Sequence, residues 1–236
     1  MSLQDRVAVI TGATGNLGTA VTKRFVSEQA QVVLTYYDEA ELEALLPQLT
    51  AETDVLPFQC DVTVEAQVRR IMQETHDQLG GPHILLNLVG GYAGGDTIAD
   101  TSETTWDRMM ALNLKSALLC CKYALTYMVP QDYGRIVNVS SKVAVDLPAK
   151  SAAYAVSKAA VISLTKCLAQ ELKGTGVSVA AIMPGIIDTP ATREARPQAD
   201  FAKWVKPEEI ADVLSFLVRS QGGALNGAIM PLFGGL

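Results

Sequence analysis

The sequence predicts an α/β protein with a three-layer, doubly wound parallel sheet, folded as a single domain over residues 1–236. Two observations support this fold class. Short, continuous apolar runs alternate with helical patterns at a steady spacing, as in a parallel sheet that is covered on both faces. The first run also ends in a glycine-rich turn that leads into a helix.

Strands are expected at the β-rich apolar runs, which are residues 7–10, 32–34, 55–60, 84–86, 136–139, 177–182 and 228–232. Helices are expected where apolar residues recur with helical spacing, which gives residues 17–25, 42–49, 64–79, 106–128 and 152–173. A last helix begins at Pro207, where proline fits the first turn and the following acids suit the helix dipole.

Composition narrows the classes of function. The chain has 236 residues, of which 49% are hydrophobic, and a net charge of −6. These values exclude a disordered chain and disfavour nucleic-acid binding through phosphates. The first residues contain no signal-peptide hydrophobic region, and the apolar stretch 117–129 is interrupted by Lys122. We therefore expect a cytoplasmic protein with no membrane or nucleic-acid partner.

The cysteines and histidines do not predict a metal site. Cys60, Cys120, Cys121 and Cys167 form no Cys-x-x-Cys pair, and we expect buried free thiols. No group of histidines, cysteines or carboxylates has the spacing of metal ligands.

The glycine-rich turn predicts a dinucleotide site. Gly12, Gly15 and Gly18 lie between the first strand and the first helix, where glycine lets the backbone approach a pyrophosphate over the helix amides. Asp61 follows the third strand, where a carboxylate would reach an adenine amine or would cap the next helix. Asn87 and Gly90 end the fourth strand, either under a nicotinamide ribose or in a tight turn.

A tyrosine and a lysine one helical turn apart predict the chemistry. Tyr154 and Lys158 share a helix face, and a nearby ammonium would lower the pKa of the phenol toward neutral. Ser141 lies upstream at the carboxyl end of a strand, where ligand sites of open α/β sheets form. The three residues together favour proton transfer to or from a substrate oxygen.

With these motifs in order, the whole chain resembles the short-chain dehydrogenase/reductase family, whose fold is of the Rossmann type. The matching elements are the glycine turn, Asp61-Val62, residues 87–90, Asn113, Ser141, Tyr154 with Lys158, and residues 184–190. The resemblance implies an NAD(P)-dependent oxidoreductase that acts on a small carbonyl or alcohol. It also implies a homodimer or homotetramer, with residues 231–236 completing a tetramer.

The resemblance implies roles for four catalytic residues. Tyr154 would be the general acid or base, and Lys158 would hold the nicotinamide ribose and lower the tyrosine pKa. Ser141 would hydrogen-bond the substrate oxygen, and Asn113 would support a water-linked proton relay.

The implied cofactor contacts are spread over the turn and the strand ends. They are Gly12, Thr14, Gly15, Asn16, Leu17, Gly18, Tyr36, Asp38, Asp61, Val62, Asn87, Gly90, Tyr154, Lys158, Pro184, Gly185, Ile187 and Thr189.

The sequence departs from the family pattern at the cofactor. Asn16 stands where most single-domain members have the middle glycine of the turn, which leaves the pyrophosphate contact open. Tyr36 and Tyr37 follow the second strand, where an acid selects NAD and a base selects NADP. Asp38 would bind the ribose hydroxyl or cap the next helix. The cofactor is NAD or NADP. Neither position 36 nor position 37 carries a basic residue that could pair with the 2′-phosphate of NADP, which favours NAD.

Residues 189–206, where the family builds its substrate loop, are few in this chain. Trp204 would stack on a planar substrate, or with Phe201 would pin the loop to the core. This segment and residues 90–95 are similar to dihydropteridine reductase, a family member that reduces a planar quinonoid pterin without the serine. An alternative of another class is a regulatory protein that senses NAD(P).

Overall fold

The computed structural model describes residues 3–49, 55–219 and 222–235. Its strands form one seven-stranded parallel sheet in the order β3-β2-β1-β4-β5-β6-β7. The strands are β1 (Val7–Thr11), β2 (Gln31–Tyr36), β3 (Val55–Gln59), β4 (Ile84–Asn87), β5 (Gly134–Val139), β6 (Val177–Pro184) and β7 (Ile229–Leu232). The order reverses between β1 and β4, so a ligand crevice is expected at the carboxyl ends of these two strands.

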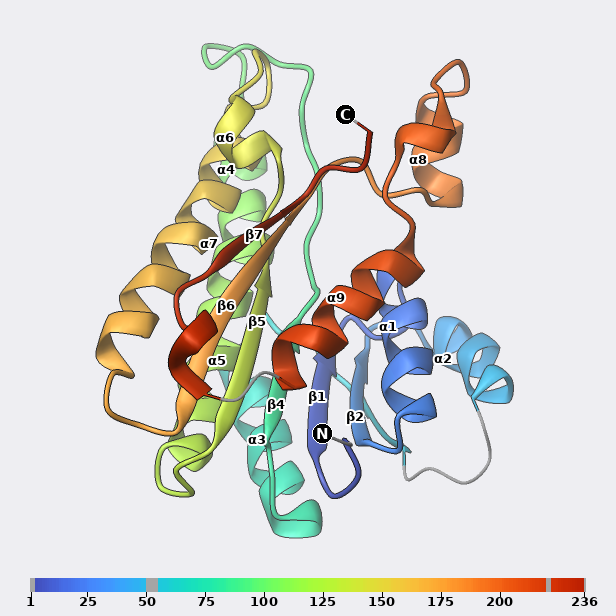
Figure 1. Ribbon diagram of the computed structural model, residues 1–236. Coiled ribbons are helices and arrows are strands. Elements are labelled where there is room, and N and C mark those ends of the chain that lie inside the picture. The colour runs from blue at the N-terminus through green and yellow to red at the C-terminus, as the bar shows by residue number, and fades with distance from the viewer. Residues whose placement is uncertain (1–2, 50–54, 220–221, 236) are drawn as a thin grey trace.

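Helices cover both faces of the sheet, as predicted (Figure 1). They are α1 (Asn16–Ser27), α2 (Glu39–Leu45), α3 (Glu65–Leu79), α4 (Glu103–Met109), α5 (Ser116–Met128), α6 (Val143–Asp146), α7 (Ala152–Glu171), α8 (Pro190–Ala195) and α9 (Pro207–Arg219). Helices α1 and α9 lie side by side on one face, and α3, α5 and α7 lie on the other (Figure 1).

Alternation along β1 divides the core into two layers. Ala8 and Ile10 pack with α1 and α9, whereas Val7 and Val9 pack with α3, α5 and α7. These residues are fully buried, because successive side chains of a strand point to opposite faces. A sheet with two covered faces therefore needs the continuous apolar runs that the sequence contains.

The strand predictions are confirmed, with ends that move by one or two residues, and three features differ. The predicted helix 42–49 is α2 followed by a 3₁₀ turn over Leu46–Gln48. The predicted helix 106–128 contains a π-helical segment over Met110–Lys115. The short helices α6 and α8 were not predicted, since four to six residues are too few to show a helical period.

Cys60, Cys120 and Cys121 are buried free thiols, as expected, but the prediction for Cys167 is wrong because this residue is exposed on α7. Among the described residues, no group of three or more histidines, cysteines or carboxylates is placed to hold a metal ion. Of the described helices, α7 alone has the length and composition to cross a membrane. It packs against β6 and carries Tyr154 and Lys158, so we assign it to the protein core. The segment predicted to complete a tetramer, residues 231–236, ends at Leu236, which lies outside the described residues.

Candidate active site

The glycine turn after β1 is fixed by its neighbour β2. Thr35 of β2 accepts a hydrogen bond from Gly12 N through its hydroxyl (3.2 Å) and one from Ala13 N through its carbonyl (3.0 Å). Gly12 has φ +64°, a left-handed conformation that favours glycine. The turn is therefore held open at the carboxyl end of β1.

The three glycines have different roles. A Cβ on Gly18 would lie 2.0 Å from Gly12 O, so Gly18 allows α1 to approach the turn. A Cβ on Gly15 would contact Gly12 O alone, at 3.6 Å, and Gly15 caps α1 without a side-chain hydrogen bond. No side chain at Gly12, Gly15 or Gly18 therefore covers the first backbone amides of α1, and we call these three residues the glycine cradle. This geometry fits a dinucleotide pyrophosphate, even though Asn16 replaces the usual middle glycine.

Acidic residues surround the start of α2, beside this turn. Thr14 donates a hydrogen bond from its hydroxyl to Glu41 Oε2 (2.7 Å). Asp38 accepts one from Ala40 N (2.9 Å), so its role as helix cap is confirmed. A hydrogen bond to Glu39 raises the pKa of Tyr36. The sequence analysis missed Glu41, which is five residues beyond the end of β2.

The end of β4 is joined to the end of β1 and to β5 through polar contacts. Thr11 accepts hydrogen bonds from Leu88 N (3.1 Å) and Val89 N (3.4 Å), which ties the end of β4 to that of β1. Asn87 donates to Asn138 Oδ1 on β5 (2.8 Å). These contacts place residues 87–90 at the crevice where the strand order reverses.

Asp61 does not cap α3, so that interpretation is wrong. The N-cap of α3 is Val64. One Asp61 oxygen instead accepts from the amide (2.9 Å) and hydroxyl (2.7 Å) of Thr63 and bends the turn after β3. The neighbouring Val62 is buried, with 4% of its surface exposed.

Asn113 holds the loop that follows β4. Its amide oxygen accepts from Gly91 N and its amide nitrogen donates to Gly91 O, each at 3.0 Å, and also to Ser157 Oγ on α7 at 3.0 Å. A Cβ on Gly90 would lie 2.8 Å from Asn113 Oδ1 and 2.9 Å from Lys158 Nζ. Asn113, Gly90 and Lys158 therefore meet at one point. The π-helical segment that contains Asn113 is of a kind often found at functional sites.

Tyr154 and Ser141, the predicted proton donor and its hydroxyl partner, are neighbours in the structure. Burial raises the pKa of the Tyr154 phenol, a hydrogen bond with Ser141 lowers it, and the neighbouring Tyr92 phenol raises it. The net pKa is raised and Lys158 is not among the causes, so the lowering expected from Lys158 stays a prediction. At neutral pH the phenol is thus protonated and able to donate.

Lys158 is buried among uncharged groups. Its Nζ donates to Val139 O at the end of β5 (2.9 Å), and 4% of its surface is exposed. Burial lowers the pKa of Lys158 to about 8, because the fold excludes water around the ammonium. The amine therefore lies at the carboxyl end of β5, close to Gly90.

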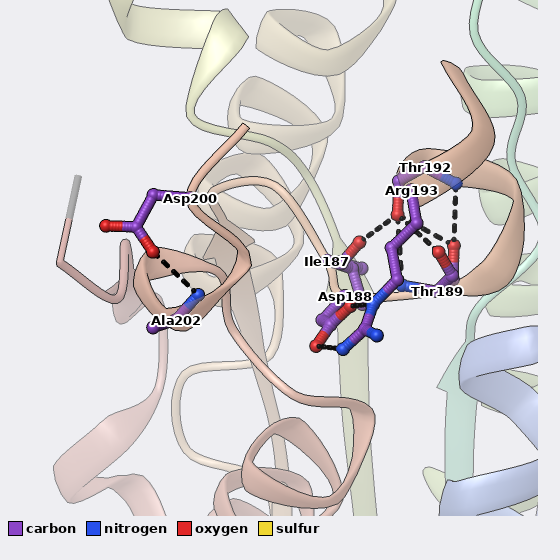
Figure 2. A network of polar contacts seen from close by, with 7 residues as sticks. All are labelled: Ile187, Asp188, Thr189, Thr192, Arg193, Asp200 and Ala202. Carbon is purple, nitrogen blue, oxygen red and sulfur yellow. Dashed lines mark hydrogen bonds and ion pairs between the residues drawn. The ribbon is translucent and has the colours of Figure 1, made fainter. Parts of the chain in front are cut away.

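The segment after β6 forms a hydrogen-bonded turn centred on Thr192 (Figure 2). The Thr192 hydroxyl donates to Ile187 O (2.6 Å) and accepts from Thr189 N (2.9 Å), and Thr189 Oγ1 accepts from Thr192 N (3.2 Å). Arg193 makes a two-point ion pair with Asp188, at 2.5 and 2.8 Å. Thr192, which the sequence analysis did not identify, therefore occupies the groups of Ile187 and Thr189 that were expected to contact a carboxamide.

Two backbone contacts position the preceding residues. Pro184 O accepts from Lys142 N (2.7 Å), and Gly185 N donates to Leu232 O on β7 (2.8 Å). These contacts bring the end of β6 next to the segment that carries Ser141.

Trp204 does not present its ring to the crevice. It is buried, with 5% of its surface exposed, and packs against Phe201 with ring centroids 4.8 Å apart. The stacking hypothesis is therefore wrong, and the two aromatic rings pin the 189–206 segment to the protein.

The catalytic residues predicted from the sequence thus converge at the carboxyl ends of β4 and β5. A phenol, a hydroxyl and a buried amine lie beside the loop that follows β4, and the other side of this loop, at Val89, lies against Gly12 of the glycine turn. This arrangement suits a reaction in which a substrate carbon would exchange a hydride with a bound dinucleotide and the substrate oxygen would exchange a proton with Tyr154.

Comparison with known proteins agrees with this geometry. The family model described as short chain dehydrogenase matches residues 6–200. The 3-oxoacyl-[acyl-carrier-protein] reductase FabG of Thermotoga maritima is 31% identical over 100% of this chain and 99% of the relative. The (2S)-[(R)-hydroxy(phenyl)methyl]succinyl-CoA dehydrogenase subunit BbsD of Thauera aromatica is 32% identical, over 100% and 98%.

A solved structure shares the complete fold. The crystal structure of NAD⁺-bound xylitol dehydrogenase aligns with a TM-score of 0.91 at 25% identity and covers 100% of both chains.

Proposed function

This chain belongs to the short-chain dehydrogenase family and is a nicotinamide-dependent oxidoreductase, and we propose that it interconverts a small carbonyl and its alcohol with Tyr154 as general acid and base. The observation that carries the proposal is the Tyr154–Ser141 pair at the carboxyl end of β5. The relatives fit this reaction, since one is named as a reductase of an oxo compound and another as a dehydrogenase of a hydroxy compound.

A nicotinamide cofactor, when bound, would supply the hydride that the carbonyl carbon takes up in reduction. Tyr154 transfers its phenolic proton to the carbonyl oxygen. The raised pKa of Tyr154 favours this direction, because the phenol stays protonated at neutral pH. The Ser141 hydroxyl hydrogen-bonds the same oxygen and stabilises the charge that develops on it. In oxidation, Tyr154 accepts the proton from the alcohol.

Lys158 and Asn113 assist Tyr154 by positioning the cofactor and the loop beside it. The amine of Lys158, held at Val139 O, would bind the nicotinamide ribose. Asn113 fixes Gly91 and Ser157 through its side chain, and so sets the loop under that ribose. The carboxamide would bind at Ile187 and Thr189 and displace the Thr192 hydroxyl from them.

We infer that NAD is preferred over NADP. The adenosine ribose of a dinucleotide over the glycine cradle would lie near Tyr36 and α2. There the carboxylates of Asp38 and Glu41 are held in place by Ala40 N and Thr14. A carboxylate accepts hydrogen bonds from ribose hydroxyls and repels a 2′-phosphate.

Two other functions remain distinguishable by experiment. A planar quinonoid substrate, as in dihydropteridine reductase, is less well supported, because Ser141 is present and close enough to Tyr154 to lower the pKa of its phenol. A protein that only senses NAD(P) has no need of that pair. Replacing Tyr154 by phenylalanine would abolish turnover in an enzyme and leave a sensor unchanged.

The proposal includes a cytoplasmic homodimer or homotetramer with no nucleic-acid partner. The acidic chain supports the last point, since its net charge of −6 offers no broad basic surface.

The experiment that tests the proposal is titration with NADH and then NADPH. Energy transfer from tryptophan and tyrosine to the bound nicotinamide reports binding, and a panel of aldehydes, ketones and a quinonoid dihydropterin follows. Saturable binding of NADH and reduction of a simple carbonyl are expected. If neither dinucleotide binds, the proposed function is wrong.

A further inference from the structure

A second tyrosine stands against the catalytic one. The rings of Tyr92 and Tyr154 are 5.1 Å apart between centroids and 74° apart in plane, an edge-to-face contact. Tyr92 is 62% exposed, although its ring contacts that of the half-buried Tyr154. A carbonyl that receives the Tyr154 proton must approach that hydroxyl from solvent. Tyr92 therefore borders its path.

The loop that carries Tyr92 is fixed at both ends. Asn113 bonds both backbone groups of Gly91, and Gly95 N donates to Lys150 O just before α7 (2.8 Å). A Cβ on Gly94 would lie 2.3 Å from the Tyr92 hydroxyl oxygen. The loop is therefore folded around the tyrosine, with Gly94 directly against its hydroxyl. A ring held in this way loses little conformational freedom when a ligand binds.

The Tyr92 phenol also acts on the reacting group, because it raises the pKa of Tyr154. The segment that follows Ser141 carries apolar side chains into solvent as well, with Val145 52% and Leu147 64% exposed. Exposed apolar side chains close to a polar catalytic pair are typical of a site that binds an apolar substituent.

We propose that Tyr92 is a specificity-determining residue that binds a flat, apolar substituent, an aromatic ring, on the reacting carbonyl carbon. This inference rests on the proposed function and names its substrate class. The substituent lies against the exposed part of the Tyr92 ring, and the carbonyl oxygen then points to Tyr154 and Ser141.

The test uses the full chain with saturating NADH and matched pairs of carbonyls, benzaldehyde with butanal and acetophenone with 2-butanone. The wild type is compared with Tyr92→Phe, Tyr92→Ala and Ile98→Ala. Ile98 is a matched control, because it is 68% exposed in the same connection between β4 and α4.

The expected result is a wild-type preference for the aryl member of each pair. Tyr92→Ala lowers the aryl-to-alkyl ratio of kcat/KM by about tenfold or more, and the loss falls on the KM of the aryl substrate. Tyr92→Phe keeps the ratio within about threefold, since the ring is retained. Ile98→Ala keeps the wild-type ratio. Thermal melting establishes that each variant is folded, and Tyr92→Leu replaces the alanine variant if that one is not.

Two results overturn this inference alone: a wild type that reduces the alkyl members as well as the aryl members, or an aryl preference that survives in Tyr92→Ala. A wild type that reduces no carbonyl with NADH or NADPH overturns the proposed function, and the inference with it.

Discussion

The glycine turn makes a prediction that separates cofactor binding from folding, through Gly15→Ala. Gly15 has φ −68° and ψ 173°, which alanine adopts without strain. Its Cβ would meet one atom, Gly12 O, at an ordinary 3.6 Å. The weaker helix capping of alanine and its smaller unfolded-state entropy offset one another, so stability changes by less than about 1 kcal/mol. This corresponds to a shift in Tm of less than about 4 °C for a domain of this size.

Binding of NADH responds differently. The new methyl group would lie at the start of α1, which has no side-chain cap and where the proposed pyrophosphate oxygen would take its hydrogen bonds from backbone amides. Loss of one such charge-assisted bond costs about 1.5–3 kcal/mol. The Kd for NADH should therefore rise by about tenfold to a hundredfold.

Gly18→Ala is the matched control, because its Cβ would lie 2.0 Å from Gly12 O and 2.7 Å from the Ala13 carbonyl carbon. Backbone must move, which costs about 3 kcal/mol or more and lowers Tm by about 6–12 °C. Melting curves and NADH titration of both variants give the comparison. The reasoning is refuted if Gly15→Ala binds NADH as the wild type does, or if Gly18→Ala is as stable as the wild type.

Three further predictions concern Glu41 beside the glycine turn, and Asn113 and Lys158 at the ends of β4 and β5. Glu41→Arg should lower the ratio of the Kd for NADPH to the Kd for NADH by about tenfold, because a guanidinium pairs with a 2′-phosphate. The same titration measures both constants. An unchanged ratio would mean that the adenosine ribose does not lie near residue 41. Asn113→Ala removes the hydrogen bonds of this buried side chain to Gly91 N, Gly91 O and Ser157 Oγ and should destabilise the protein by about 2–4 kcal/mol in denaturant unfolding. A loss below about 0.5 kcal/mol would contradict that network. The pKa of Lys158 is about 8 in the folded protein, below the ordinary lysine value of about 10.4 that applies in the unfolded chain. Between these two pKa values the unfolded chain binds more protons than the folded protein does. The free energy of unfolding therefore rises with pH in this range. Relative to Lys158→Met, the wild type should gain about 3 kcal/mol of unfolding free energy from pH 7 to pH 10.5, and a constant difference would show that the amine is not desolvated.

Much of the fold was predictable because it depends on local patterns. A strand buried on both faces must be apolar throughout, and a phosphate cradle must be glycine-rich, so β1 and the turn at Gly12 are visible in the sequence. The convergence of Ser141 and Tyr154 also follows, because the carboxyl ends of parallel strands share one edge.

The rest depends on contacts between distant segments. Nothing in the local sequence says that Tyr92 would meet Tyr154, or that Thr192 would occupy the groups of Ile187 and Thr189. The pKa of Tyr154 likewise depends on burial, since it is governed by desolvation first. Trp204 has the size to stack on a substrate, and its packing against Phe201 is set by the fold.

The central claim, that Tyr154 is the proton donor of an oxidoreductase, is tested most directly by Tyr154→Phe with two readouts on the same sample. NADH-dependent reduction of the best carbonyl of the panel should fall by about 10²–10⁴-fold, the usual size of general acid catalysis. The Kd for NADH should stay within about threefold of the wild type, because the ring and Lys158 remain. Turnover within about tenfold of the wild type would contradict the account, since no other group in the proposed mechanism donates that proton.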